Sequence, residues 1–130
     1  MRDDKIGEFL DRVADRVPAP GGGAAAALQA ALGAALLAMV GRYSVGPDFA
    51  QHQETIDRVV AEADELRGIA LRLAEADEAA FSAVAAAYRL PKTTDEEKAT
   101  RSAAVAEAVV NAALSAVSKR NAAAAGMGES

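Results

Sequence analysis

One carboxylate in the sequence is placed where it could transfer protons. Asp77 is predicted to project from the middle of the apolar stripe of a long helix, because Leu73 precedes it by one turn and Phe81 follows it by one turn. The neighbouring acids Glu75 and Glu78 point away from that stripe. A buried carboxylate needs a partner or a raised pKa, so Asp77 is a candidate general acid or base. The alternative is a structural role, in which Asp77 ties two helices through an arginine or reaches water at the edge of the stripe.

A second candidate is the segment at residues 17–23, which reads Val-Pro-Ala-Pro-Gly-Gly-Gly. Prolines and glycines at this density predict a sharp loop. The apolar run that follows predicts a helix, so the N–H groups of Gly21, Gly22 and Gly23 are expected at its positive end, where they could cradle an anion or an oxygen-rich ligand. A turn of small residues, needed where two helices cross closely, explains the same segment equally well. The loop follows a helix and lacks a Gly-Lys-Ser/Thr sequence, so it is neither a dinucleotide-binding fingerprint nor a P-loop.

Arg89 and Lys92 form a small basic patch beside Pro91 on an otherwise acidic chain. The patch suits an anionic ligand, although charged residues in a loop are more often simply solvated. His52 is the only histidine and lies in polar company, and the chain has no cysteine. These residues offer little for a transition-metal site, and we expect no metal.

Composition narrows the class of protein. The formal net charge of −5 argues against a nucleic-acid partner, which requires a basic surface. Residues 1–10 contain Asp3, Asp4 and Glu8 instead of a basic start and an apolar core, so no secretory signal is expected and the protein is predicted to be cytoplasmic. The chain is 52% hydrophobic but only 4% aromatic, so small side chains must fill its core, and close helix contacts or a second copy must compensate.

Four helices are predicted, at about residues 3–16, 24–43, 51–89 and 94–120, with residues 121–130 as a frayed tail. Gly46-Pro47-Asp48 and Leu90-Pro91 separate the later ones, and Thr94 with Glu97 forms a capping box. No strand-like alternation occurs. The expected fold is a single all-α domain over residues 1–130, an antiparallel helical bundle.

The run at residues 24–40 has Gln29 as its only polar side chain, so its helix must be covered on all sides. It is shorter than the ~20 residues of a membrane span and rich in weakly apolar alanine, so we expect a buried soluble helix and no membrane. So short a chain can hardly cover this helix alone, and a homodimer or higher symmetric oligomer is predicted. Gly33, in its middle, suggests that a neighbouring backbone passes close by.

Two blocks of the sequence resemble one family. The first is the segment at residues 17–23 followed by Ala24-Ala25-Ala26, and the second contains Asp77-Glu78-Ala79-Ala80-Phe81, Tyr88-Arg89-Leu90-Pro91-Lys92 and Glu96-Glu97-Lys98. Together they are similar to the cyclodeaminase domain of formiminotransferase-cyclodeaminase and to the related methenyltetrahydrofolate cyclohydrolases. The resemblance extends from about residue 5 to about residue 119.

This resemblance implies an all-α homodimer and one-carbon chemistry on a tetrahydrofolate derivative as substrate. It implies that Pro20, Gly21, Gly22 and Gly23 line the folate site. It also supports Asp77 and Lys92 as catalytic residues. Arg89, which forms the basic patch with Lys92, is predicted to bind the substrate. A chain without a formiminotransferase domain favours the cyclohydrolase over the cyclodeaminase reaction.

Two departures from the family support an alternative, a non-catalytic oligomeric helical module that binds folates or is purely structural. Ala24 stands where the family often has serine, which removes a hydroxyl donor. Family domains also continue for several dozen residues beyond the fourth helix, whereas this sequence stops at residue 130. We expect either a fragment or a short variant whose bundle is completed by its partner.

Overall fold

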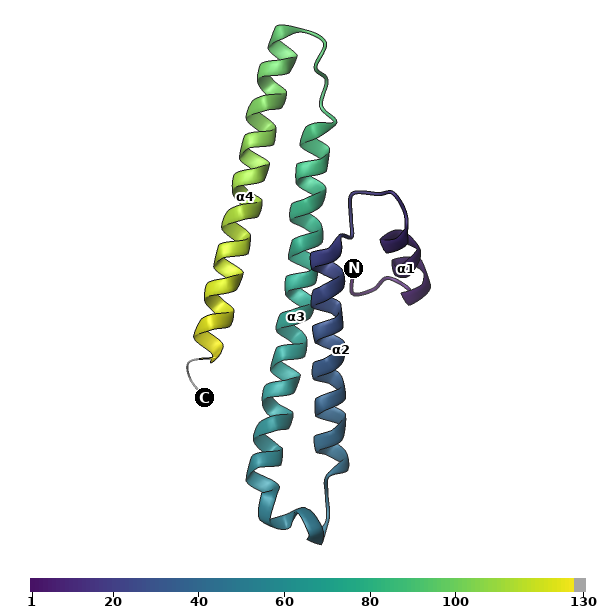
Figure 1. Ribbon diagram of the computed structural model, residues 1–130, viewed down its shortest axis with the longest axis vertical. Coiled ribbons are helices and arrows are strands. Elements are labelled where there is room, and N and C mark those ends of the chain that lie inside the picture. Colours follow the sequence, from purple (N-terminus) through teal and green to yellow (C-terminus); the bar gives the residue numbers. More distant parts are fainter. Residues whose placement is uncertain (128–130) are drawn as a thin grey trace. The chain divides into compact units, whose positions relative to one another are not determined.

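The computed structural model describes residues 1–127, apart from the side chains of residues 119, 120, 122–124, 126 and 127. It contains four α-helices and one 3₁₀-helix, and the described residues include no strand. The helices are α1 (Ile6–Ala14), α2 (Gly22–Tyr43), α3 (Gln53–Tyr88) and α4 (Asp95–Met127), with η1 (Pro47–His52) between α2 and α3 (Figure 1). The predicted all-α class is therefore confirmed for this part of the chain.

The helix boundaries differ from the predicted ones at several ends. Gly22 and Gly23 lie inside the first turn of α2 and not in the loop. Residues 51 and 52 belong to η1, which follows Gly46 with a φ of 105° that glycine adopts readily. Helix α4 continues through Met127, beyond the expected end near residue 120, and the rest of the expected frayed tail, residues 128–130, lies outside the described residues.

The chain divides into two compact units. The first unit comprises Met1, Asp3–Gly21 and the residues from Ala76 onward, and the second unit comprises Arg2 and Gly22–Glu75. Helix α3 contributes its first part to the second unit and its last part to the first unit.

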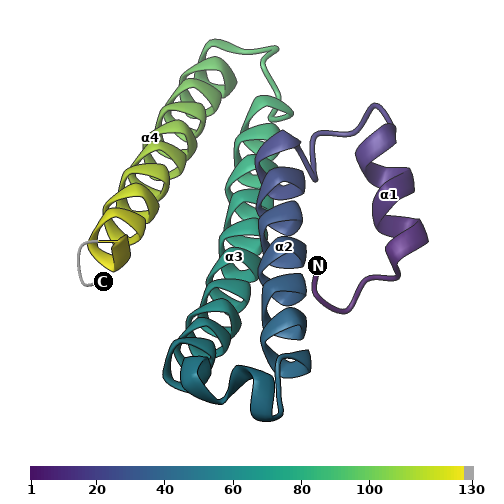
Figure 2. The same cartoon turned by 60° about the horizontal axis from the view of Figure 1, so that its bottom comes forward.

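In the second unit, α2 lies beside the first part of α3 (Figures 1 and 2). Small residues allow this close approach: Ala31, Ala34, Ala38 and Gly41 are buried on α2, and Ala63, Ala70 and Ala74 are buried on α3. The contact is closest at Gly41, where an added Cβ would lie 2.4 Å from Cγ2 of Val60. An ion pair of 2.5 Å between Arg42 and Asp64 joins the same two helices.

The large apolar side chains of α2 face away from this contact. Leu32, Leu36 and Val40 are 64%, 52% and 58% exposed. The prediction that this helix is covered on all sides is therefore not met within one chain. Around Gly33 an added Cβ would find no atom within 4 Å, so no neighbouring backbone of this chain explains that glycine.

Helix α2 is also the one described helix that is long and apolar enough to span a membrane, with a mean hydropathy of 1.8 and 22% of its apolar window buried. The core helix of a soluble protein passes the same test of length and composition. The length and composition of α2 therefore do not by themselves decide what covers its apolar face.

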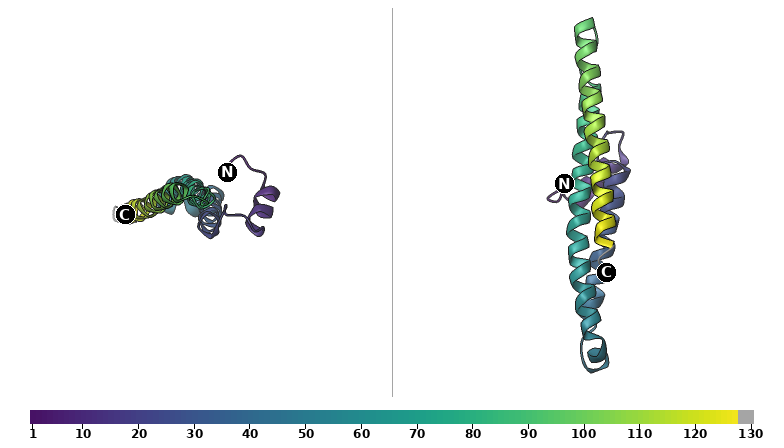
Figure 3. Two further views of the ribbon diagram at one scale, coloured as in Figure 1. Left: turned by 90° about the horizontal axis from the view of Figure 1, so that it is seen from above. Right: turned by 90° about the vertical axis from the view of Figure 1, so that its left-hand side faces the viewer.

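In the first unit, α4 lies beside the last part of α3 (Figures 1 and 3). Alanines again form the contact, and Ala87 is buried there. Helix α1 buries Phe9 and is joined to α3 by an ion pair between Arg12 and Glu78.

Candidate functional site

Asp77 lies on α3, one residue inside the first unit, and its side chain is partly buried. The apolar residues of its stripe are only partly covered: Leu73 and Val84 are half-buried and Phe81 is 50% exposed. Among the described residues, Asp77 has no hydrogen-bond or ion-pair partner. Its carboxylate is therefore available to a ligand or to another chain lying against this stripe.

The acids on either side of Asp77 are both paired. Glu78 forms its ion pair with Arg12 of α1, and Arg12 also donates to Asp4 at 2.9 Å. The hydrogen bond that Arg12 donates to Glu78 raises the pKa of Arg12. Glu75 lies 2.5 Å from a guanidinium nitrogen of Arg2, and this hydrogen bond lowers the pKa of Glu75.

The alternative that Asp77 ties helices through an arginine has no support in the described part of the chain. Glu78 forms such a tie to α1, and Glu75 binds Arg2, which precedes α1. The predicted role of Asp77 in proton transfer stays a prediction.

The glycine segment differs from the predicted free loop. Gly21 alone precedes α2, whereas Gly22 and Gly23 open it, and Pro20 is buried behind a cis Ala19–Pro20 peptide bond. The first N–H groups of a helix have no partner within it, so these glycines still present free donors at the positive helix end. An added Cβ at Gly21 or Gly22 would meet no atom within 4 Å, so space is open on this side of the backbone.

The three glycines lie where the first unit passes into the second, so a site formed jointly by them and Asp77 remains a prediction. Ala24, at the position where the family often has serine, has no exposed surface. A hydroxyl at this position would therefore point into packed atoms and not toward solvent.

Arg89 and Lys92 are both exposed in the turn between α3 and α4. Side chains of α4 fix both ends of this turn. At one end, Nε of Arg101 donates to the carbonyl oxygen of Tyr88 at 3.2 Å, and the guanidinium carbon lies 5.3 Å from the centre of the Tyr88 ring. At the other end is the predicted capping box: the Glu97 N–H donates to Thr94 Oγ1 at 3.1 Å, and the Thr94 N–H donates back to Glu97 Oε2 at 3.4 Å.

Asp77 and the turn are far apart along α3. Tyr88 lies eleven positions beyond Asp77, which corresponds to about 16 Å at the rise of an α-helix. An elongated ligand could span the distance from Asp77 to this turn.

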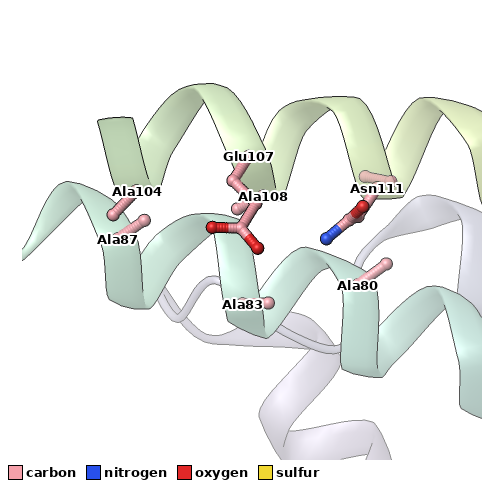
Figure 4. A pocket seen from close by; sticks show the side chains of 8 residues that line it. Ala80, Ala83, Ala87, Ala104, Glu107, Ala108 and Asn111 are labelled. Atoms are coloured by element: carbon pink, nitrogen blue, oxygen red, sulfur yellow. The ribbon is translucent and has the colours of Figure 1, made fainter. Parts of the chain in front are cut away.

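A groove of about 340 Å³ lies between α3 and α4 in this interval. Helix α3 contributes Ala80, Ala83 and Ala87, and α4 contributes Ala104, Ala108, Ala112, Glu107 and Asn111. Figure 4 shows the side chains of Glu107 and Asn111 directed from α4 toward α3. Sequence analysis did not single out these two residues, although a glutamate and an asparagine one turn apart in an alanine-rich helix could have been noticed.

No group of three potential metal ligands occurs among the residues that the structure describes, and His52 is exposed at the end of η1. The expectation of a metal-free site stays a prediction. The described arrangement offers a carboxylate without a partner, a set of helix N-terminal donors, and a basic turn held in a fixed conformation.

Comparison with known proteins identifies the family. A sequence model described as formiminotransferase-cyclodeaminase matches residues 5–127. A methenyltetrahydrofolate cyclohydrolase from Methylorubrum extorquens is 42% identical over 108 residues, which are 82% of this chain and 52% of that protein. The formimidoyltransferase-cyclodeaminases of Rattus norvegicus and Gallus gallus are 38% and 37% identical over 108 residues, again 82% of this chain but 20% of those proteins.

The chain thus spans about half the length of the cyclohydrolase and a fifth of the bifunctional proteins. The family model covers nearly all of the chain, including both sequence blocks that first suggested the relationship. The chain belongs to the formiminotransferase-cyclodeaminase family.

Proposed function

We propose that this protein is a folate-dependent one-carbon enzyme that hydrolyses methenyltetrahydrofolate to formyltetrahydrofolate. The main support for this proposal is the family match over residues 5–127, together with the 42% identity to a protein named for this reaction. The partly buried carboxylate of Asp77, which has no partner among the described residues, supports it.

In the proposed reaction, a water oxygen attacks the electrophilic carbon that bridges N5 and N10 of the substrate. Asp77 accepts a proton from this water as the new C–O bond forms. The tetrahedral adduct then collapses: one C–N bond breaks, the released nitrogen takes up a proton, and the carbon remains as a formyl group on the other nitrogen. The N–H groups of Gly21, Gly22 and Gly23 stabilise the oxygen that develops negative charge.

Lys92 and Arg89 bind the anionic glutamate end of the substrate. The separation of about 16 Å between Asp77 and the end of α3 supports this role for Lys92 over direct proton transfer at the reacting carbon. Because Lys92 lies in a turn held at both ends, the backbone that carries its side chain loses little freedom on binding.

The cyclodeaminase reaction is the second candidate, favoured by the 38% identity to the bifunctional rat protein. There N10 attacks the formimino carbon carried by N5, and ammonia leaves. Both reactions pass through a tetrahedral carbon between the same two nitrogens, so one site with one proton-transfer group serves either reaction.

A non-catalytic folate-binding or structural module is the competing function. The missing hydroxyl at Ala24 no longer argues for it, because Ala24 is fully buried and a serine there would not reach a ligand either.

The working form of the enzyme is a cytoplasmic homodimer without a membrane or nucleic-acid partner. The exposed leucine face of α2 supports a second copy as the missing cover, since a water-exposed face of this kind is a protein-interaction surface.

Two measurements on the purified chain test the proposal. Loss of methenyl absorbance above the uncatalysed rate supports the cyclohydrolase, and formation of that absorbance from formiminotetrahydrofolate supports the cyclodeaminase. If neither reaction occurs, thermal unfolding with and without 5-formyltetrahydrofolate distinguishes a folate-binding module from a purely structural one. A ligand that binds only the folded state raises the Tm. A folded protein with no turnover and no shift contradicts every folate-related role.

A further inference from the structure

The groove between α3 and α4 lies on the path from Asp77 to the basic turn. Its first lining residue on α3, Ala80, is three residues beyond Asp77, and its last, Ala87, adjoins Tyr88. On α4, Ala104 lies three residues beyond Arg101, which anchors the turn. Along the length of α3, the three features follow one another in the order carboxylate, apolar groove and cluster of positive charge.

The lining of the groove combines a flat apolar wall with two polar groups. Six of the eight lining residues are alanines, so the walls lack long side chains that would fill the space. Glu107 and Asn111 are one turn apart, and both are directed toward α3 (Figure 4). Neither has a hydrogen-bond or ion-pair partner among the described residues, so both are free to bind a ligand.

The chemistry of these two side chains narrows the class of ligand that the groove could bind. The Glu107 carboxylate accepts hydrogen bonds, and the Asn111 amide both donates and accepts. A flat ring followed by a secondary amide fits this pattern, because the ring can lie against alanine methyl groups while the amide N–H and C=O each find a partner. The aminobenzoyl-glutamate arm of a folate has these parts in this order, between the one-carbon bridge and the terminal carboxylates.

We infer that the groove of Ala80, Ala83, Ala87, Ala104, Glu107, Ala108, Asn111 and Ala112 is the subsite for the aminobenzoyl arm of the substrate. This inference rests on the proposed function. Glu107 accepts a hydrogen bond from the N–H of the linking amide, and Asn111 binds the carbonyl oxygen of that amide or the nitrogen attached to the aromatic ring. The glutamate carboxylates then extend past Glu107 to Arg89 and Lys92, whose positive charges offset the repulsion between like charges.

Affinity for two probes tests the inference. The first probe is 5-formyltetrahydrofolate, and the second is a 5-formyltetrahydropterin with a methyl group in place of the arm. Ala83→Leu places a large side chain in the groove without changing charge, and Ala86→Leu is its matched control, because Ala86 is exposed on the same helix and does not line the groove. We expect Ala83→Leu to weaken binding of the complete folate about tenfold or more and to leave the armless pterin unaffected, whereas Ala86→Leu changes neither.

A second variant keeps the test independent of packing effects. Asn111→Leu removes the amide at nearly constant size and should weaken the complete folate several-fold but not the armless pterin. Equal losses for both probes, or no loss for either probe in both variants, would overturn the inference while leaving the proposed function intact. A wild-type chain that binds neither probe would overturn the proposed function together with the inference. Circular dichroism on each variant shows whether the helices are retained.

Discussion

Arg12 of α1 and Glu78 of α3 form an ion pair directly beside Asp77. Because of this ion pair, the adjacent carboxylates of Asp77 and Glu78 have different surroundings. Glu78 holds α1 against α3, and Asp77 faces an open apolar stripe without a partner among the described residues.

The structural role of Glu78 can be tested by Glu78→Gln. The substitution keeps the shape of the side chain and removes its charge, so α1 loses its ionic contact with α3. We expect a lower Tm and nearly unchanged turnover per folded molecule. Asp77→Asn, the matched control one residue away, should leave the Tm nearly unchanged. A reversed pattern, with Asp77→Asn destabilised and Glu78→Gln unaffected, would assign the structural role to Asp77.

Stability should fall in acid because two carboxylates are held ionised by arginines. Hydrogen bonds from Arg42 and Arg2 lower the pKa values of Asp64 and Glu75. A group with a lowered pKa in the folded state contributes stability above its unfolded pKa, about 4 for Asp and Glu, and loses it as the pH falls through the folded pKa.

We therefore expect the Tm to fall as the pH decreases below about 4, and to fall less steeply in Asp64→Asn. Asp48→Asn is the control, since Asp48 forms no ion pair among the described residues. Identical pH profiles for wild type and Asp64→Asn would show that the Arg42 pair contributes nothing.

Much of the local structure could be predicted because its causes are local. The Thr94–Glu97 capping box and the stop at Leu90-Pro91 depend on residues a few positions apart, and both are found as expected. The spacing of apolar residues placed Asp77 on the stripe of α3, where its side chain is in fact only partly buried.

Other features depend on contacts that sequence periodicity does not specify. The partners of Glu75 and Glu78 come from residues far away in the chain, Arg2 and Arg12. The groove forms because the alanine faces of α3 and α4 meet, and neither helix shows this alone. Similarly, the expected loop at Gly22 and Gly23 is helical, since the favourable alanine run that follows extends the helix backwards through both glycines.

Assembly can be tested on the exposed face of α2. Leu36→Glu places a charge where the proposed dimer buries a leucine, and should convert the dimer to a monomer in light scattering. Ala61→Glu, at an exposed position of α3, is the control and should leave the mass unchanged. A wild-type chain that is already a monomer at micromolar concentration would contradict the proposed dimer. A wild-type chain that partitions into lipid vesicles would instead place α2 in a membrane.

Arg101 should keep the α3–α4 turn from opening. Arg101→Gln removes the guanidinium whose Nε donates to the Tyr88 carbonyl oxygen and whose charge lies over the Tyr88 ring. We expect faster trypsin cleavage after Arg89 and Lys92, together with weaker binding of 5-formyltetrahydrofolate. Arg58→Gln, which removes an exposed arginine elsewhere on α3, should change neither. Unchanged cleavage in Arg101→Gln would show that the capping box alone holds the turn.

The most direct test of the proposed function is the turnover of methenyltetrahydrofolate by wild-type chain and by Asp77→Asn, measured as loss of methenyl absorbance at matched folded concentration. Asparagine has nearly the shape of aspartate but cannot accept a proton at neutral pH, and losing a positioned general base reduces rates by about 10²–10⁴. We expect turnover in wild type, a loss of this size in Asp77→Asn, and the same Tm for both. Equal turnover in the two proteins would show that Asp77 is not the proton-transfer group.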